Sequence, residues 1–228
     1  MITKRIVILA NSRKNAERCL AGVEVPFTPI NSWVRPISIR LGHGLNEMER
    51  LYQNKNEPEV LDVVDITLIR AQPHSCQSEN WLISSRQIWK KIYSISWSQA
   101  ASIAETPAAL WSNGHSTYSG KNDEVPTNLV ADFKKSLFLI HAISVVIHVF
   151  KDYTGNKKIH ASFLYCGFNY RFSVTDVIYE QQYKQKEFGN FQLGECLLTI
   201  SLGEPFTKKN GIVCHYKLIA AIIEKYRR

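Results

Sequence analysis

The chain has 228 residues, of which 45% are apolar and 21% charged, with a formal net charge of +8. This composition is that of a folded globular protein and excludes intrinsic disorder, which needs far lower hydrophobicity. No apolar run approaches the ~20 residues that span a bilayer, and the N-terminal apolar stretch is too short for a signal peptide, so we expect a cytoplasmic protein with no membrane partner.

The cysteine and histidine patterns argue against disulfides and metal sites. The chain has five cysteines, an odd number, and no C-x-x-C pair, and none of its seven histidines lies four residues from another. Glycine-rich phosphate-binding loops and the common hydrolase and metalloprotease motifs are also missing from the sequence. We therefore expect no metal and no cofactor.

Strand signals open the chain. Lys4–Ala10 is an apolar run rich in β-branched residues, and Leu61–Arg70 is a second run of this kind. Trp33–Ser38 also predicts a strand, which Pro36 restricts to an edge or an end. Between these runs, Leu45–Tyr52 has a short helical pattern.

Residues 77–112 differ in character. Apolar residues there recur at spacings of three and four, which predicts short helices near 84–93, 97–104 and 107–111. A turn-rich stretch at 115–132 follows and marks the expected boundary between a first domain, 1–114, and a second domain, 115–228.

The second half is again rich in strand signals, separated by turns such as Asp152–Asn156 and Cys166–Phe168. On the hairpin that contains the latter turn, Phe168, Tyr170 and Phe172 share one face, which we expect to point inward, and Arg171 lies on the opposite face. The last residues, Leu218–Tyr226, read as a helix. The expected strands are Ser136–His141, Ile143–Lys151, Lys158–Cys166, Asn169–Val174, Gly194–Leu202 and Ile212–Ile219.

The spacing of these elements defines the expected fold class. Short strands about 8–12 residues apart, with turns between them, are typical of barrels and sandwiches. We expect a mostly β protein with a small helical insert, built as two OB-like β-barrels packed together.

Four groups of residues are candidates for ligand contact. Asn11, Ser12, Arg13 and Lys14 follow the first predicted strand, where a polar, basic loop commonly binds ligands and Arg13 can hold a phosphate. The alternative for these four residues is an ordinary solvated turn.

Trp33 and Arg35 lie two apart on a predicted strand and therefore share a face, as a base-stacking and phosphate-clamping pair does. A cation–π pair covering the barrel edge explains them equally. The remaining candidates are His74, Glu79 and Asn80 in a polar loop, which also reads as a capped helix entry, and Lys217, which can instead pair with Glu204 across strands.

The order of several segments carries a family resemblance. Ile6–Lys14, Arg18–Gly22 and Trp33–Ser38 are followed by Pro73-His74 with Gln77-x-Glu79-Asn80, and by Leu110-Trp111-x-Asn113-Gly114. Further along come Ser173–Asp176, Leu193–Cys196, Ser201–Phe206 and Tyr216–Leu218. This series resembles the bacterial dual OB-fold-containing domain family over nearly the whole chain. The resemblance implies two OB-type barrels, a nucleic-acid or nucleotide ligand, and prophage or phage-defence neighbourhoods; it brings no catalytic residues.

Three functions follow as hypotheses. The basic charge and the candidate loops favour binding of nucleic acid, with single strands preferred over double strands. A protein partner in a multi-component system is a further expectation. The first alternative is an enzyme acting on nucleotides or nucleic acid through His74, Glu79 and Asp176, although no motif requires catalysis. The second alternative is a protein–protein adaptor of a defence complex.

Overall fold

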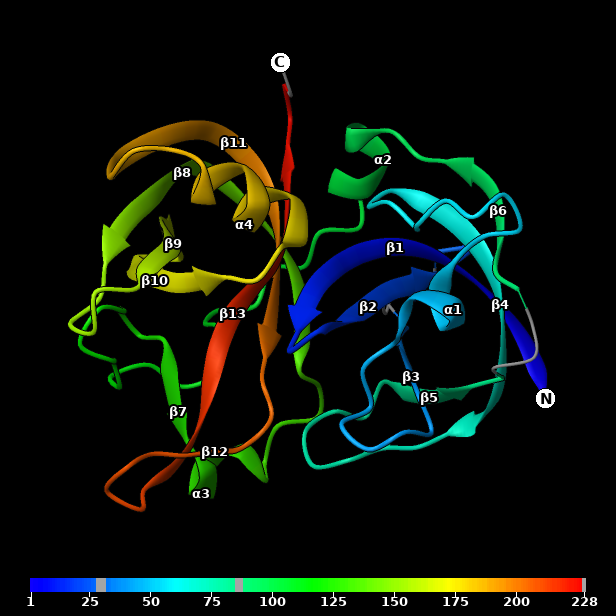
Figure 1. Cartoon of the computed structure of the whole chain (residues 1–228), viewed down its shortest axis with the longest axis horizontal. Coiled ribbons are helices and arrows are strands. Elements are labelled where there is room, and N and C mark those ends of the chain that lie inside the picture. The colour runs from blue at the N-terminus through cyan, green and yellow to red at the C-terminus, as the bar shows by residue number, and fades with distance from the viewer. Residues whose placement is uncertain (28–31, 85–87, 227–228) are drawn as a thin grey trace. The chain divides into compact units, whose positions relative to one another are not determined.

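The computed structural model describes residues 1–27, 32–84 and 88–226. It is mostly β, with 52% strand and 10% helix, which confirms the expected fold class. The chain forms two compact units, Met1–Ile103 and Ala104–Arg228 (Figure 1). The sequence alone had suggested a division after residue 114.

The first unit is built from strands with two short helices. In chain order its elements are β1 (Ile2–Lys14), β2 (Glu17–Glu24), β3 (Trp33–Ile37), α1 (Glu47–Arg50), β4 (Asp62–Ala71), β5 (Asn80–Ile83), β6 (Lys90–Ser94) and α2 (Trp97–Ala101).

Five of these strands close into a ring. β1 pairs antiparallel with β2 on one side and with β4 on the other, and the order around the ring is β1-β2-β3-β5-β4. β3 and β5 pair in parallel, and α1 lies in the connection between β3 and β4. This is the five-stranded Greek-key barrel of an OB-fold. Its interior holds Ile6, Ile8, Leu20, Val34 and Val64 with their neighbours.

The second unit contains longer strands. In chain order its elements are β7 (Glu124–Pro126), α3 (Thr127–Val130), β8 (Leu137–Lys151), β9 (Lys157–Tyr165), β10 (Phe168–Val174), α4 (Val177–Lys184), β11 (Gly189–Leu202), β12 (Phe206–Thr207) and β13 (Val213–Glu224).

The second unit repeats the topology of the first. The order of its main strands is β10-β9-β8-β11-β13, and a short parallel pairing of β10 with β13, at Ser173–Leu218 and Val174–Ile219, joins the two ends. Its helix α4 lies between the third and fourth strands of the ring, as α1 does in the first unit. Asp176 starts α4 because its Oδ1 accepts hydrogen bonds from the backbone N–H groups of Ile178 and Tyr179.

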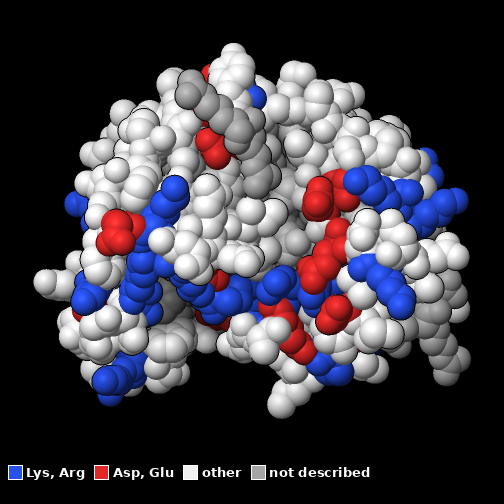
Figure 2. Space-filling view, turned by 45° about the horizontal axis from the view of Figure 1, so that its top comes forward, with Lys and Arg blue, Asp and Glu red and all other residues white. Residues whose placement is uncertain are grey.

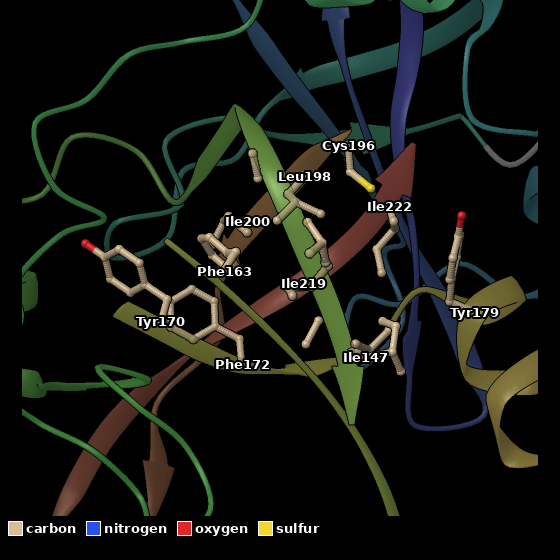
Figure 3. Packing of buried hydrophobic residues seen from close by; sticks show 14 of the residues in the cluster. Ile147, Phe163, Tyr170, Phe172, Tyr179, Cys196, Leu198, Ile200, Ile219 and Ile222 are labelled. Carbon is tan, nitrogen blue, oxygen red and sulfur yellow. The ribbon is translucent and has the colours of Figure 1, made fainter. Parts of the chain in front are cut away.

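Aromatic and aliphatic side chains fill the second barrel. Phe163, Tyr170 and Phe172 lie side by side in its interior, and Ile147 and Ile219 come from other strands (Figure 3). The rings of Phe163 and Phe172 meet edge to face, with centroids 5.5 Å apart. The inward direction expected for Tyr170 and Phe172 is confirmed, since they are 1% and 0% exposed. The burial expected for Phe168 is wrong, since this residue beside the hairpin turn is 43% exposed.

Three expected helices are wrong. Lys90–Ser94, part of the helix expected at 84–93, forms β6, an exposed strand without the alternation that identifies a strand; residues 85–87 lie outside the described residues. Residues 107–111 form bends. The C-terminal run belongs to β13, where Ile219–Ile223 is buried without a break, so the run shows no period of two. Helices are confirmed at 47–50 and 97–101, within the expected regions.

The second core offers a matched test on one strand. Ile147 is 0% exposed and Ile143 is 80% exposed, and both lie on β8. We expect Ile147→Ala to lower the free energy of unfolding by about 2–5 kcal/mol, because it leaves a cavity in a closed core. Ile143→Ala should stay within about 0.5 kcal/mol of the unchanged protein. Urea denaturation followed by tryptophan fluorescence measures both, and equal losses would contradict this core.

Candidate ligand-binding pocket

A pocket of about 840 Å³ opens on the second barrel. It is lined by β9, β10 and β13, by the connection between β8 and β9, and by the segment 116–124, with Lys208 from the connection between β11 and β13. Lys158 and His160 alternate along β9 with the core residues Ile159 and Ala161, so the pocket lies on the outer face of the sheet. In OB-folds, strands two and three and the loops after strands one and four form the ligand-binding face.

Arg171 is the central cation of this pocket. It lies on β10 opposite the inward-facing rings, and its guanidinium carbon is 4.8 Å from the centre of the Phe150 ring. Burial lowers the pKa of Arg171, and within the described part of the chain no carboxylate forms an ion pair with it and Nε has no hydrogen-bond partner. A partly buried guanidinium in this state is suited to an anionic ligand.

His160 forms a neutral neighbour to this cation. It is 7% exposed, and its ring meets that of Phe150 edge to face at 4.9 Å. Burial, followed by the charge of Arg171, lowers the pKa of His160 to about 4, so the ring is uncharged at pH 7. Its Nδ1 has no hydrogen-bond partner among the described residues, which leaves one polar atom of the ring unused.

Two of the lysines that line the pocket are paired with carboxylates. Lys208 forms an ion pair with Glu124 at 2.6 Å, and Lys158 lies 3.5 Å from a carboxylate oxygen of Asp152. Figure 2 shows that many lysine and arginine side chains on the face in view lie next to acidic ones. Arg171 therefore differs from these two lysines, because no residue that the structure describes gives it an acidic partner.

A loop closes one side of the pocket. The backbone N–H and the hydroxyl of Thr117 both donate to the carboxylate of Asp123, at 2.7 and 2.6 Å, and the N–H of Gly120 donates to the Thr117 hydroxyl. A Cβ atom on Gly120 would lie 1.9 Å from a carboxylate oxygen of Asp123, so only glycine fits this position without a shift. Lys121 and Arg171 exchange two backbone hydrogen bonds of 3.1 Å, which fasten the loop to β10.

A chain of three polar side chains continues along this outer face. His148 Nε2 lies 2.7 Å from the Ser162 hydroxyl, and its Nδ1 lies 2.7 Å from the Asn190 side-chain oxygen. Burial lowers the pKa of His148, which favours the neutral ring. The three side chains thus fix each other's orientation beside Arg171, the cross-strand partner of Ser162.

The first candidate group lies in a strand and not in a loop. β1 continues through Lys14, and the hairpin turn to β2 is made by Asn15, which has a φ of 55°, and Ala16. Asn11 is buried and donates to the carbonyl oxygen of Pro58, and Ser12 is buried with its hydroxyl 3.3 Å from the Cys19 carbonyl. Arg13 is exposed and Lys14 partly exposed, next to the first interstrand loop of the barrel.

The structure brings three other candidates together. Arg35 and Glu79 form an ion pair at 3.1 Å with side chains only 4% and 3% exposed, and Asn80 is the register partner of Arg35 across the parallel β3–β5 pairing. Trp33 is buried on the same strand, whereas His74 is exposed in the connection between β4 and β5. Trp33 and Arg35 on β3, and His74 and Glu79 in the connection between β4 and β5, thus lie on elements that bind ligands in OB-folds, although three of the four are buried.

Lys217 points into the second barrel. It is 0% exposed; its Nζ donates to the Ser112 carbonyl oxygen at 2.7 Å and to the Asn113 side-chain oxygen at 3.2 Å. Nζ also lies 5.6 Å from the centre of the Tyr170 ring. Burial lowers the pKa of Lys217 to about 7. The side chain therefore closes the barrel interior.

The carboxylates of the enzyme hypothesis both hold parts of the fold. Glu79 is paired with Arg35, and Asp176 accepts hydrogen bonds at the start of α4 and, through Oδ2, from the backbone N–H of Ile222. Each therefore has a structural role within its own unit.

The sequence places Arg171 on the face of its hairpin opposite the aromatic rings, but neither Arg171 nor His160 is among the candidates that the sequence motifs indicate. The signal that was present is the alternation of β9 and β10, which puts both residues opposite the core. The contribution of the segment 116–124 had no such signal, because its contacts with β10 are long-range.

The two closed rings, each with a parallel pairing and a helix between its third and fourth strands, define a protein with two OB-folds. The chain belongs to the dual OB-containing domain family, whose model matches residues 4–222. Among solved structures it is similar to the crystal structure of the tetrameric p202 HIN2, with 8% identity over 98% of this chain and 93% of that chain, at a TM-score of 0.33. None of the curated proteins matches the chain. Among the described residues, no helix is long and apolar enough to cross a membrane.

The buried ion pair of the first barrel gives a prediction on stability. We expect Glu79→Ala to lower the free energy of unfolding by about 3–5 kcal/mol, because Arg35 then stays buried without its carboxylate. Asp65→Asn, which breaks the more exposed pair with Arg5, should leave the urea midpoint nearly unchanged. Equal shifts of the two midpoints would contradict the burial of the Arg35–Glu79 pair.

Lys217 gives a prediction on pH dependence. Its folded pKa of about 7 lies below the ordinary lysine value of 10.5, so between these values the unfolded chain holds a proton that the folded chain lacks. The contribution of Lys217 to the free energy of unfolding should therefore rise with pH from about 7 to about 10. Urea midpoints at pH 7, 8 and 9 should rise relative to those of Lys217→Met, whereas the exposed-site control Lys186→Met should follow the unchanged protein. Parallel curves for all three proteins would rule out a lowered pKa.

Proposed function

We propose that the second barrel binds single-stranded nucleic acid in the pocket around Arg171. The observation that carries this proposal is the Arg171 guanidinium over the Phe150 ring, on the face that binds oligonucleotides in OB-folds. No carboxylate in the described part of the chain forms an ion pair with it. A cation without an acidic partner attracts a phosphate, and the pocket also offers aromatic rings such as that of Tyr153 for a base. The net charge of +8 supports a polyanionic ligand.

A single strand is the favoured ligand for a physical reason. The pocket is lined partly by connections and by the outer faces of strands, and its volume of about 840 Å³ is that of a site for one or two small ligand units. Only a single strand can turn a base out toward such a site without breaking base pairs.

The first barrel supplies a second proposed contact region. Arg13, Lys14 and His74 are the candidates there whose side chains reach solvent, at the hairpin after β1 and in the connection after β4. Asn11, Ser12, Trp33, Arg35, Glu79 and Asn80 are buried, so we propose that they support these loops. The cytoplasmic location, a protein partner and a role in phage defence stay predictions from the sequence.

Binding titrations test the pocket. Fluorescence anisotropy with labelled single-stranded DNA, single-stranded RNA and duplex DNA at 50 and 200 mM salt should show salt-dependent binding that is tightest for a single strand. Arg171→Gln should weaken it by about tenfold to a hundredfold, since a charge-assisted hydrogen bond contributes ~1.5–3 kcal/mol.

Substitutions of two lysines distinguish binding in the pocket from attraction by the overall positive charge. Lys151 lines the pocket and has no carboxylate partner among the described residues, whereas Lys186 follows α4 outside the pocket lining. Lys151→Ala should weaken binding and reduce the slope of log affinity against log salt by about 0.7, the value for one lost single-strand phosphate contact, and Lys186→Ala should do neither. Absence of salt-dependent binding at low ionic strength would refute the proposed function, and full affinity in Arg171→Gln would refute the assigned pocket.

A further inference from the structure

The pocket is blocked along one side by the loop 116–120. Lys121 pairs with Arg171 at the edge of β10 that faces away from β9. Two residues earlier, the backbone of Ser119 hydrogen-bonds to His160, which lies on β9. The loop must therefore pass over the outer face of β10 to reach β9.

This crossing changes what kind of ligand the face accepts. An open OB face forms a groove that tracks the backbone of a strand over several nucleotides. Here the loop is held by the Thr117–Asp123 hydrogen bonds and by the Ser116 hydroxyl, which accepts from the backbone N–H of Asn122 at 2.9 Å. A strand that enters the pocket cannot continue past this loop while these bonds are in place.

The charges in the blind pocket indicate which part of a strand fits. Among the described residues Arg171 has no acidic partner and His160 is neutral. Two of the lysines that line the pocket are already paired with Glu124 and Asp152. A terminal phosphate carries about −1.5 to −2 charges at pH 7, whereas an internal phosphodiester carries one. The terminal group gains more from a single unpaired guanidinium.

We propose that this pocket receives the phosphorylated end of a single strand, with the terminal phosphate on Arg171 and the terminal nucleotide against Phe150. This inference rests on the proposed function and narrows it from any single-stranded segment to a strand end. A free nucleotide monophosphate presents the same chemistry, so the test must separate the two sources.

Strands of one sequence and length, with different ends, provide the test. Linear strands with a 5′-phosphate, with a 3′-phosphate or with hydroxyl ends, and a covalently closed circle, are titrated against the full chain in anisotropy or competition assays. We expect at least one phosphorylated linear strand to bind tenfold or more tightly than both the circle and the hydroxyl-ended strand, and Arg171→Gln to abolish the difference.

The outcomes distinguish the inference from the function on which it rests. Equal affinity for the circle and the phosphorylated strands overturns the end inference and leaves single-strand binding standing. No binding to any strand overturns the proposed function itself. A nucleoside monophosphate that displaces the strand at the strand's own concentration assigns the pocket to free nucleotides and overturns the strand-end inference.

Two glycine variants test the role of the loop. Gly120→Ala would press on the Asp123 carboxylate and release the loop, whereas a Cβ on Gly203 would make only ordinary contacts, the nearest at 3.4 Å. In Gly120→Ala we expect the circle to bind within about threefold of the phosphorylated linear strand, and in Gly203→Ala we expect the tenfold preference to persist. Thermal melts confirm that both variants fold. A folded Gly120→Ala protein that keeps the full preference would refute the loop as the cause.

Discussion

The short parallel pairing that closes each barrel is the constraint on which the rest of the structure depends. In the second barrel only Ser173–Leu218 and Val174–Ile219 join β10 to β13. On the β10 side the adjacent edge position, at Arg171, is taken by Lys121, and on the β13 side Cys214–Tyr216 pair with β7. The segment that contains Lys121 and β7 thus forms hydrogen bonds with backbone groups of β10 and β13. In a fully closed ring these two strands would pair with each other along their length. The pocket exists because that segment, once inserted, continues over the outer face.

Each barrel contains a buried basic side chain, and the two barrels stabilise it in different ways. The first barrel encloses Arg35 with Glu79 across its parallel pairing, so the guanidinium and carboxylate neutralise each other. In the second barrel no ion pair forms with Lys217 among the described residues; it donates to two oxygen atoms at Ser112 and Asn113, and burial lowers its pKa. The charge of Asp123, in the segment 116–124 that lines the pocket, favours the protonated form of Lys217.

The sequence predicts the strand content, the two-barrel class and the direction of the aromatic hairpin, because these depend on local alternation and on apolar runs. It fails where burial removes the alternation, as in β13, or where exposure on both faces does the same, as in β6. The site was harder to predict for a different reason. Arg171 contacts Phe150 and His160 contacts Ser119, and both partners are distant in sequence. The sequence pattern of β3 indicates that Arg35 contacts a ligand, whereas in the structure it forms an ion pair with Glu79.

The glycine at position 120 makes the shape of the binding face easy to change in evolution. The loop that closes the pocket depends on one carboxylate whose space any larger residue at 120 would take, while the barrel beneath is held by strand pairings that do not involve this position. If the pocket binds strand ends as proposed, a single codon change at position 120 is expected to convert it into an open groove on the same scaffold. A change of ligand preference would then need no change in the strand pairings that hold the barrel.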